Sequence, residues 1–360
     1  MKAWYKESLD APLICMDVPD PEVRSGAVVV DVLAVHVPAY LMSMVNSTAI
    51  PLPVPLVLGA GGVGIVRKKA ADVFNVSVGD VVALDCLVSS GDPERPEDVL
   101  MGLGEIGGRG EETDVVKAMR ILWRNGTMAE QAVLPKEAVT RLPGAERYED
   151  LHRLAFLTWL GIAGEGVTRS GQQPGDVVAI LGATGQMGGA AVLVALARGA
   201  SRIVAVGRND AALERLSSLD PRVVPVKLTG DVKGDAAAVT AVAGPPHVVI
   251  DTMGDADNAN AILTGIESIR DEGTLVLMGG VRSDIPIPYG DVLQRRLTIR
   301  GSRMYRPGTL LSIWRMVEAG QIDLANVGIV NAGIDDPEGA ARLAQQTHGL
   351  NIVALASLSS

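Results

Sequence analysis

A glycine-rich turn between two apolar runs constrains this chain more than any other feature of its sequence. "DVVAI" (Asp176 to Ile180) is a short apolar run, and the turn "LGATGQMGG" follows it at once. "GGAAVLVALARGA" then has the composition of a helix that ends at Gly199. "RIVAVG" (Arg202 to Gly207) is a second apolar run. This order, completed within about thirty residues, predicts a βαβ unit of a parallel sheet.

The turn itself predicts a phosphate-binding site. Glycines let the backbone approach a pyrophosphate, and the following helix N-terminus supplies N–H donors and positive dipole. A nucleotide cofactor would therefore contact the residues of this turn, which are Gly182, Thr184, Gly185, Gln186, Met187 and Gly188.

Two other glycine runs compete for this role, and both lack its context. The first, with Gly59, Gly61 and Gly64, matches G-x-G-x-x-G strictly, but "PLPVPLV" before it is rich in proline and strand-like segments follow it instead of a helix. The second, with Gly102, Gly104 and Gly107, lies among acidic residues and predicts a surface loop.

The end of the second strand bears on the choice of cofactor. An NAD site usually carries Asp or Glu there, to bind the ribose 2′-hydroxyl. This chain has Gly207, Arg208 and Asn209, which leave room for a 2′-phosphate and supply a guanidinium to pair with it. Asp210 is the one nearby residue that argues for NAD(H). We expect NADP(H).

Further strands of the same kind follow along the chain. "HVVIDTMG", "GTLVLMGG" and "RLTIRGS" each predict a strand that ends near glycine, with helical stretches such as "DNANAILTGIESIR" between them. Ligands of such sheets bind at the carboxyl ends of the strands. That rule adds Thr252, Met278, Gly279 and Gly280 to the expected cofactor pocket.

Composition excludes several classes of function. The 360 residues carry a net charge of −10 and only 3% aromatic residues, which argues against a nucleic-acid-binding surface. No apolar run reaches the ~18 residues of a membrane span, and the first residues lack the apolar core of a secretory signal. Cys15 and Cys86 form neither a disulfide framework nor a zinc cluster. We expect a cytoplasmic protein with a small-molecule substrate.

Taken in order, these segments resemble the medium-chain dehydrogenase/reductase superfamily, which contains zinc alcohol dehydrogenases and zinc-free quinone and enoyl reductases. Further markers are "NGTMAEQAVLP", "LTWLGIAG", "IDTMG" and "LTIRGS". The resemblance implies an α/β fold with a Rossmann doubly wound parallel sheet and a β-rich GroES-like catalytic domain. The implied domains are 1–150 (catalytic), 151–304 (Rossmann, NADP-binding) and 305–360 (return to the catalytic domain).

The resemblance also implies that no metal is bound. In zinc-dependent members the counterpart of "LGAGGVG" reads G-H-E-x-x-G, and its His and Glu belong to the catalytic zinc site; here those positions are Ala60 and Gly61. The positions of the two zinc cysteines fall at Pro38 and at about Leu154. The lobe 87–125, where a structural zinc would lie, contains no cysteine, and His36 alone is better interpreted as a packed residue.

Without zinc, hydrogen-bond donors must stabilise the developing oxyanion. Tyr40 occupies the position of the Ser or Thr that relays a proton in zinc dehydrogenases, and it could serve as a donor or only as a pocket wall. Thr158 and Met304 fall at positions that lie near the nicotinamide or close the pocket in relatives. The Asn that zinc-free relatives carry at Pro38 and the Tyr of enoyl reductases near Ala49 are both missing.

The sequence therefore predicts a zinc-independent, NADPH-dependent oxidoreductase that reduces an enone or a quinone. Two alternatives stay open: a carbonyl or alcohol oxidoreductase in which Tyr40 replaces zinc, and a non-catalytic NADPH-binding sensor. By resemblance we expect a homodimer or homotetramer. The segment 110–123, with Val115, Met119 and Leu122 on one predicted helix face, would cover either the substrate cleft or a subunit contact.

Overall fold

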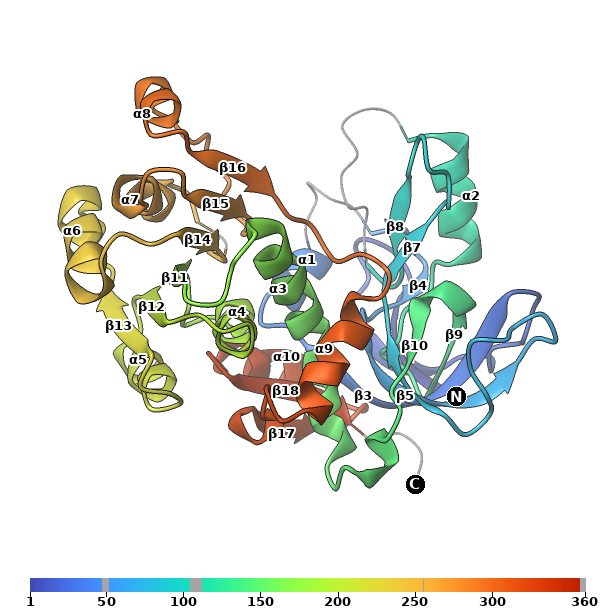
Figure 1. Cartoon of the computed structure of the whole chain (residues 1–360). Coiled ribbons are helices and arrows are strands. Elements are labelled where there is room, and N and C mark those ends of the chain that lie inside the picture. The colour runs from blue at the N-terminus through green and yellow to red at the C-terminus, as the bar shows by residue number, and fades with distance from the viewer. Residues whose placement is uncertain (47–51, 104–111, 255, 357–360) are drawn as a thin grey trace. The chain divides into compact units, whose positions relative to one another are not determined.

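The computed structural model describes residues 1–46, 52–103, 112–254 and 256–356. The chain forms two compact units (Figure 1). The first contains Met1–Thr158, Val327–Thr347 and the end of the chain from Asn351; the second contains Trp159–Asn326 and His348–Leu350. The chain thus returns to the first unit at Val327, whereas the sequence placed this return at residue 305.

The segment 305–326 belongs to the second unit because its contacts are there. Glu165, on helix α3 (Leu157–Ser170), is buried and accepts hydrogen bonds from Arg306 Nε at 2.8 Å and from Thr309 Oγ1 at 3.1 Å. Helix α9 (Thr309–Glu318) packs its Leu310 and Ile313 against glycines of α3. An acidic residue inside an apolar helix thus anchors this segment.

The second unit is built on a six-stranded parallel sheet in the order β13-β12-β11-β14-β15-β16. Helices α4 and α5 lie on one face and α6 and α7 on the other, which confirms the doubly wound α/β fold (Figure 1). The strands are β11 (Val177–Leu181), β12 (Arg202–Gly207), β13 (Val223–Lys227), β14 (Val248–Asp251), β15 (Thr274–Leu277) and β16 (Thr298–Gly301). The helices between them are α4 (Gln186–Ala197), α5 (Asp210–Ser217), α6 (Val232–Ala243), α7 (Asn260–Ser268) and α8 (Tyr289–Gln294).

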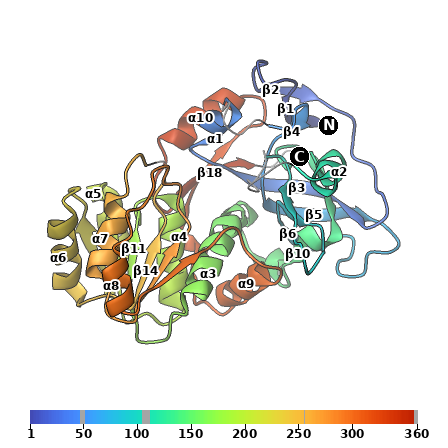
Figure 2. The same ribbon diagram turned by 90° about the horizontal axis from the view of Figure 1, so that it is seen from above.

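The first unit is rich in β-structure, as the GroES-like expectation requires. Its main sheet follows the order β10-β6-β5-β3-β18-β17, with β9 also paired to β3, and Figure 2 shows β3, β5, β6 and β10 in succession. The strands of this unit are β1 (Lys2–Lys6), β2 (Ile14–Asp17), β3 (Ala27–Val37), β4 (Leu56–Val57), β5 (Gly62–Lys69), β6 (Val81–Leu84), β7 (Leu87–Ser89), β8 (Asp98–Leu100), β9 (Gln131–Pro135), β10 (Val139–Arg141), β17 (Gly328–Ala332) and β18 (Asn351–Ala356). Its helices are α1 (Leu41–Val45), α2 (Asp114–Leu122) and α10 (Pro337–Gln345).

Helix α2 forms where the amphipathic segment predicted it, and the Thr113 hydroxyl caps its N-terminus by accepting from Val116 N at 3.2 Å. The predicted apolar face is right at Met119 and wrong at Val115 and Leu122. Val116 and Met119 pack on the core of the first unit together with Trp123, against whose ring the Arg24 guanidinium stacks at 4.1 Å. The side chains of Val115 and Leu122 are instead exposed. Helix α2 therefore packs on its own domain through a different stripe from the one predicted.

No helix in residues 1–46, 52–103, 112–254 or 256–356 is long and apolar enough to cross a bilayer.

Candidate cofactor and catalytic sites

The predicted glycine turn connects strand β11 to helix α4. Gly182 has a φ of +79°, which favours glycine, and both Gly182 N and Ala183 N donate to Val206 O at 2.9 Å, so the turn is fastened to the neighbouring strand β12. A Cβ on Gly188 would lie 2.2 Å from the carbonyl oxygen of Gly182. Glycine at this position is thus required by the close approach of the helix to the turn.

The other residues of the turn line its open side. Gly185 is the N-cap of α4, and Gln186 and Met187 form the beginning of that helix, whose positive N-terminal end favours an anion. The Thr184 side chain packs beside Gly207, where a Cβ would lie 2.4 Å from the Thr184 methyl group. The turn therefore fits the pyrophosphate of a dinucleotide. Glycine at 207 is needed for packing against Thr184, in addition to any room that it leaves for a 2′-phosphate.

The end of strand β12 presents a cationic side chain. Arg208 is exposed, and no ion pair or hydrogen bond engages its guanidinium in the described part of the chain. Asn209 caps helix α5 by accepting from Ala212 N at 3.0 Å. Asp210, the residue that argued for NAD(H), forms an ion pair with Lys227 at 2.6 Å. Arg208 is therefore available to a phosphate while the nearby carboxylate is already engaged.

The carboxyl ends of β14 and β15 meet at a buried carboxylate that the sequence interpretation missed. Asp251 accepts from Met253 N at 2.9 Å and from Gly279 N at 3.3 Å, and burial raises its pKa to about 6. A Cβ on Gly279 would lie 2.5 Å from the Met253 carbonyl oxygen, and Gly280 N donates to that same oxygen. The signal for this role was an Asp at the end of a wholly apolar strand.

Two of the remaining predicted pocket residues, Thr252 and Met278, are engaged within their own unit. The Thr252 hydroxyl donates to Leu181 O at 2.7 Å and ties β14 to β11. The sulfur of Met278 packs against Gly166 of helix α3. Met304 has a φ of +51° in the segment that the Glu165–Arg306 contact anchors. Thr252 and Met278 thus contribute to the expected cofactor pocket mainly by holding neighbouring elements of the second unit together.

The strict G-x-G-x-x-G run lies in the first unit, where it follows β4 and continues into β5. Strand β5 begins at Gly62, so no helix follows the run and no helix N-terminus faces it. Gly59 is required by packing instead, because a Cβ there would lie 2.4 Å from Met128 N. Of the second run, Gly104 and Gly107 lie outside the described residues, as does Ala49. The strict run is therefore a place where two backbone segments pack closely, and not a dinucleotide-binding turn.

The zinc site that the superfamily implies does not fit the residues present. A Cβ on Gly61 would lie 2.3 Å from the Thr158 hydroxyl oxygen, so Thr158 fills the space that a Glu ligand would need. The Thr127 hydroxyl donates to Gly61 O at 2.7 Å. Leu154 is fully buried in the core, and no three His, Cys, Asp or Glu side chains among the described residues gather closely enough to hold a metal.

Tyr40 belongs to the first unit and stands directly before helix α1. Leu41 and Val45 anchor α1 in the core, while 51% of the Tyr40 surface is exposed. Desolvation, with a smaller contribution from Cys86, raises the pKa of the Tyr40 phenol to about 12. The exposed fraction indicates that solvent reaches the Tyr40 side chain. The raised pKa indicates that its hydroxyl group is desolvated. Both agree on a neutral phenol at pH 7, because even its ordinary pKa is about 10.

Cys86 adds no metal ligand. Its side chain is buried, and desolvation together with the charge of Asp85 raises the pKa of the Cys86 thiol well above its ordinary value. Among the described residues, Cys86 belongs to no group of side chains that could hold a metal. Around Gly61 the first unit thus presents the hydroxyl groups of Thr127 and Thr158.

Comparisons with known proteins agree with this architecture. Residues 24–144 match the model of the alcohol dehydrogenase GroES-like domain, and residues 187–319 match that of the zinc-binding dehydrogenases. D-xylulose reductase A of Aspergillus niger is 28% identical over 278 residues, which cover 75% of this chain and 72% of that protein. An alcohol dehydrogenase of Geobacillus stearothermophilus is 27% identical over 305 residues, covering 84% of each chain.

Solved structures share the fold along nearly the whole chain. The alcohol dehydrogenase from Thermus sp. ATN1 superposes with a TM-score of 0.79 at 22% identity, over 98% of this chain and 100% of the other. A dehydrogenase from Sinorhizobium meliloti 1021 bound to NADP gives a TM-score of 0.77 at 21% identity, over 98% of each chain. With both domain models matched and a nicotinamide cofactor implied by the fold, the chain belongs to the medium-chain dehydrogenase/reductase superfamily and is an oxidoreductase.

Proposed function

We propose that the protein is a zinc-independent, NADPH-dependent reductase whose hydride acceptor is an enone or a quinone. The observation that carries this proposal is the contact of Thr158 with Gly61, which removes the space for a zinc ligand. A carbonyl reduced directly needs strong polarisation at the reacting carbon. An enone or quinone spreads the developing charge onto a remote oxygen, which a neutral hydroxyl can stabilise.

The bound cofactor would supply the hydride, and the chain's own residues would do the rest. Gly182, Gly185 and Gly188 allow the backbone to approach its pyrophosphate. Tyr40 would donate a hydrogen bond from its phenol to the acceptor oxygen and then its proton. The high pKa of Tyr40 keeps that proton in place over the neutral and mildly alkaline range.

A second candidate, reduction of a carbonyl or oxidation of an alcohol, draws support from the relatives. Both are named for such substrates: a D-xylulose reductase and an alcohol dehydrogenase. In this case Tyr40 would act on the oxygen of the reacting carbonyl itself. A third candidate is a sensor that binds NADPH without turnover.

The decisive experiment uses cyclohexenone, which contains both reducible bonds. Protein treated with a chelator and verified free of zinc by elemental analysis is incubated with NADPH, and the product is identified by gas chromatography. We expect cyclohexanone, with a rate within about twofold of untreated protein, because no metal participates. Cyclohexenol would support the second candidate, and loss of turnover that zinc restores would end the zinc-independent proposal. NADPH binding without turnover of enones, quinones or aldehydes would favour the sensor.

The preference for NADPH rests on Arg208. Arg208→Ala should raise the Kd of NADPH about tenfold or more, since a charge-assisted pair with phosphate contributes about 1.5–3 kcal/mol, and should leave the Kd of NADH unchanged. Arg202→Ala, an exposed arginine at the opposite end of β12, is the matched control. Fluorescence titration with both cofactors measures each Kd, and equal effects on NADPH and NADH would overturn the assignment.

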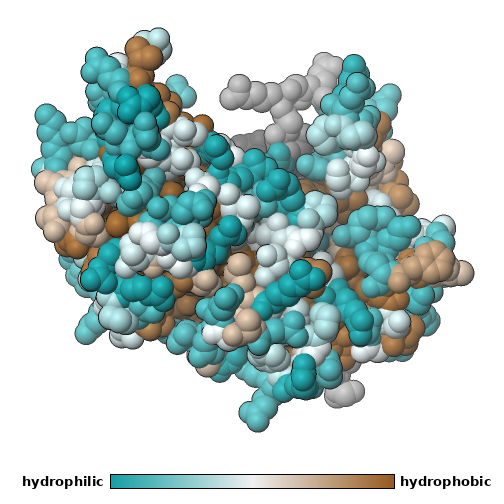
Figure 3. Space-filling model, viewed as in Figure 1, coloured by the Kyte–Doolittle hydropathy of each residue, from teal (hydrophilic) through white to brown (hydrophobic). Residues whose placement is uncertain are grey.

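We also propose that the protein is cytoplasmic and forms a homodimer or homotetramer through the edge of the parallel sheet. Strand β16 ends the sheet order, so one of its edges is unpaired within the described chain. Nearby, Ile287, Tyr289 and Leu293 are exposed, and apolar side chains stand out over α8 at the upper left of Figure 3. Unpaired strand edges and exposed apolar groups favour association. A monomer in sedimentation velocity would exclude the proposed homodimer or homotetramer.

A further inference from the structure

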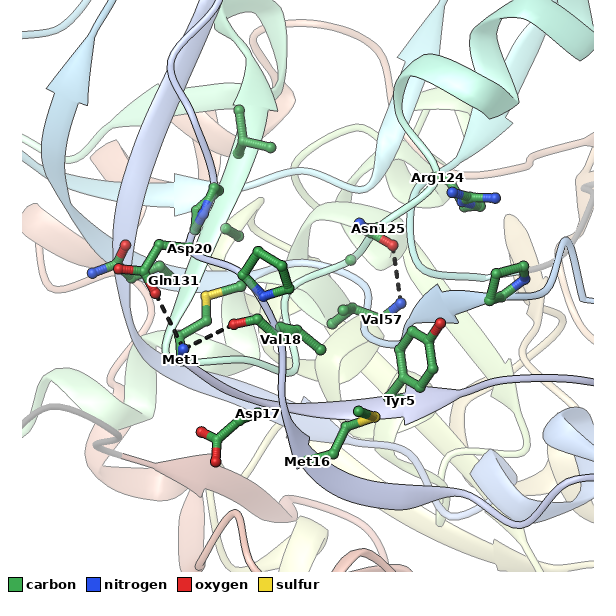
Figure 4. A pocket seen from close by; sticks show the side chains of 16 residues that line it. Met1, Tyr5, Met16, Asp17, Val18, Asp20, Val57, Arg124, Asn125 and Gln131 are labelled. Carbon is green, nitrogen blue, oxygen red and sulfur yellow. Dashed lines mark hydrogen bonds and ion pairs between the residues drawn. The ribbon is translucent and has the colours of Figure 1, made fainter.

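A cavity, which we call the Arg124 pocket, lies in the first unit apart from the proposed catalytic residues. It encloses about 440 Å³ between β1, β2, β4, β9 and the segment before β9. This volume falls within the range of small-molecule sites. None of its lining residues belongs to the glycine turn or to the group around Tyr40, and the sixteen side chains are drawn in Figure 4.

One end of the pocket carries hydrogen-bond donors that the protein leaves unused. Arg124 forms no ion pair or hydrogen bond through its side chain within the described residues, and its Nε is shielded from solvent as well. Asn125 Oδ1 accepts from Val57 N at 3.0 Å, which fixes the amide so that its NH₂ group remains available. In Figure 4 the Tyr5 hydroxyl lies at the same side as Arg124 and Asn125, and it too has no described partner.

The opposite end is different because both carboxylates that line the pocket, Asp17 and Asp20, lie there. The Met1 ammonium donates to Val18 O at 2.9 Å and to Asp20 Oδ1 at 3.1 Å. The Asp17 carboxylate is exposed, and in Figure 4 it points away from Arg124 and Tyr5. The Arg124 guanidinium therefore lies apart from both carboxylates that line the pocket.

Between the two ends the pocket has an apolar floor. Val57 is buried and packs with Ala3 and Ala129, and the side chains of Tyr5 and Val18 pack against this cluster. Prolines and Met16 complete the wall. A partly buried cation without a partner costs free energy, and a complementary anion relieves that cost. An anionic head joined to an apolar body matches the donor end and the floor together.

We propose that the Arg124 pocket binds a small monocarboxylate with an apolar body, at a site separate from that of the hydride acceptor. The carboxylate would accept from the Arg124 guanidinium, the Asn125 amide and the Tyr5 hydroxyl, and the apolar body would cover Val57. Arginine suits this role because its planar fork matches a carboxylate. The proposal is independent of the reaction that the enzyme catalyses.

Hydrocinnamate is the probe, and hydrocinnamyl alcohol is its neutral counterpart of similar shape. We expect calorimetry on the whole protein to detect hydrocinnamate binding that Arg124→Gln weakens about tenfold or more, with no such effect from Arg202→Gln. A second measurement uses NMR on protein labelled at its methionine methyl groups. Hydrocinnamate should shift the resonance of Met16, which lines the pocket, both in the free protein and in the NADPH-bound protein.

Three results would overturn the proposal. The first is equal affinity for the acid and the alcohol, since the charge would then contribute nothing. The second is a Met16 resonance that hydrocinnamate leaves in place. The third is unchanged hydrocinnamate affinity in Arg124→Gln. The first two measurements need only the wild-type protein, so they decide the matter even where the variant does not fold.

Discussion

Tyr40→Phe is expected to lower kcat about 100-fold or more while leaving the Kd of NADPH unchanged. The substitution keeps the ring that fills the recess and removes only the hydroxyl that would donate to the acceptor oxygen. Because the pKa of Tyr40 is raised to about 12, the donor loses its proton only as the pH rises toward that value. The pH–rate profile of the wild type should therefore show no loss from this group below about pH 10.

Steady-state kinetics with the preferred acceptor measure the change in kcat, and fluorescence titration measures cofactor affinity. Tyr289→Phe is the control, because Tyr289 is 79% exposed on α8 and has no proposed part in the reaction. Unchanged turnover in Tyr40→Phe would mean that Tyr40 lines the pocket without donating a proton. A parallel loss of NADPH affinity would mean that the substitution disturbed the structure and not the proton donor alone.

The sequence predicted the second unit well because its signals are local. A strand, a glycine turn and an alanine-rich helix follow one another in β11, the turn and α4, and each part is recognisable from neighbouring residues alone. Element ends shifted by one or two residues, as hydrogen bonds at the ends of elements depend on the surrounding structure. The choice between the two glycine runs that the structure describes in full was resolved for the same reason, since the run at Gly182 opens a helix and the run at Gly59 leads into a strand.

Features set by contacts between distant residues escaped prediction. Val115, Met119 and Leu122 form a regular helix face, but of these only Met119 packs on the core, together with Val116 and Trp123. Glu165 would ordinarily be read as a surface residue.

Gly207 shows a related limit, because one residue can serve two requirements. The sequence explained it by room for a 2′-phosphate, while the structure adds a packing contact with Thr184. The placement of Thr158 against Gly61 joins segments far apart in the chain, and no periodicity reports such a contact.

The glycine turn gives the other large expected effect. Gly188→Ala should raise the Kd of NADPH about 30-fold or more, because its Cβ would lie 2.2 Å from Gly182 O and 2.6 Å from the Ala183 Cα. Both contacts are with backbone, so the turn itself must move, and overpacking of this kind costs about 1–3 kcal/mol. The moved turn would no longer present its N–H groups to the pyrophosphate. Fluorescence titration measures the affinity, and circular dichroism reports whether the fold is retained.

Gly185→Ala is the matched control within the same turn. Its φ is −85°, and its Cβ would meet only Gly182 O, at an ordinary 3.4 Å. We therefore expect Gly185→Ala to melt at the wild-type temperature, so any effect on NADPH affinity would report the approach of the cofactor to Gly185 itself. Wild-type affinity in a folded Gly188→Ala would show that the cofactor does not depend on the geometry of this turn. Together the pair separates the two uses of glycine here: room for the neighbouring backbone at 188 and room for the ligand at 185.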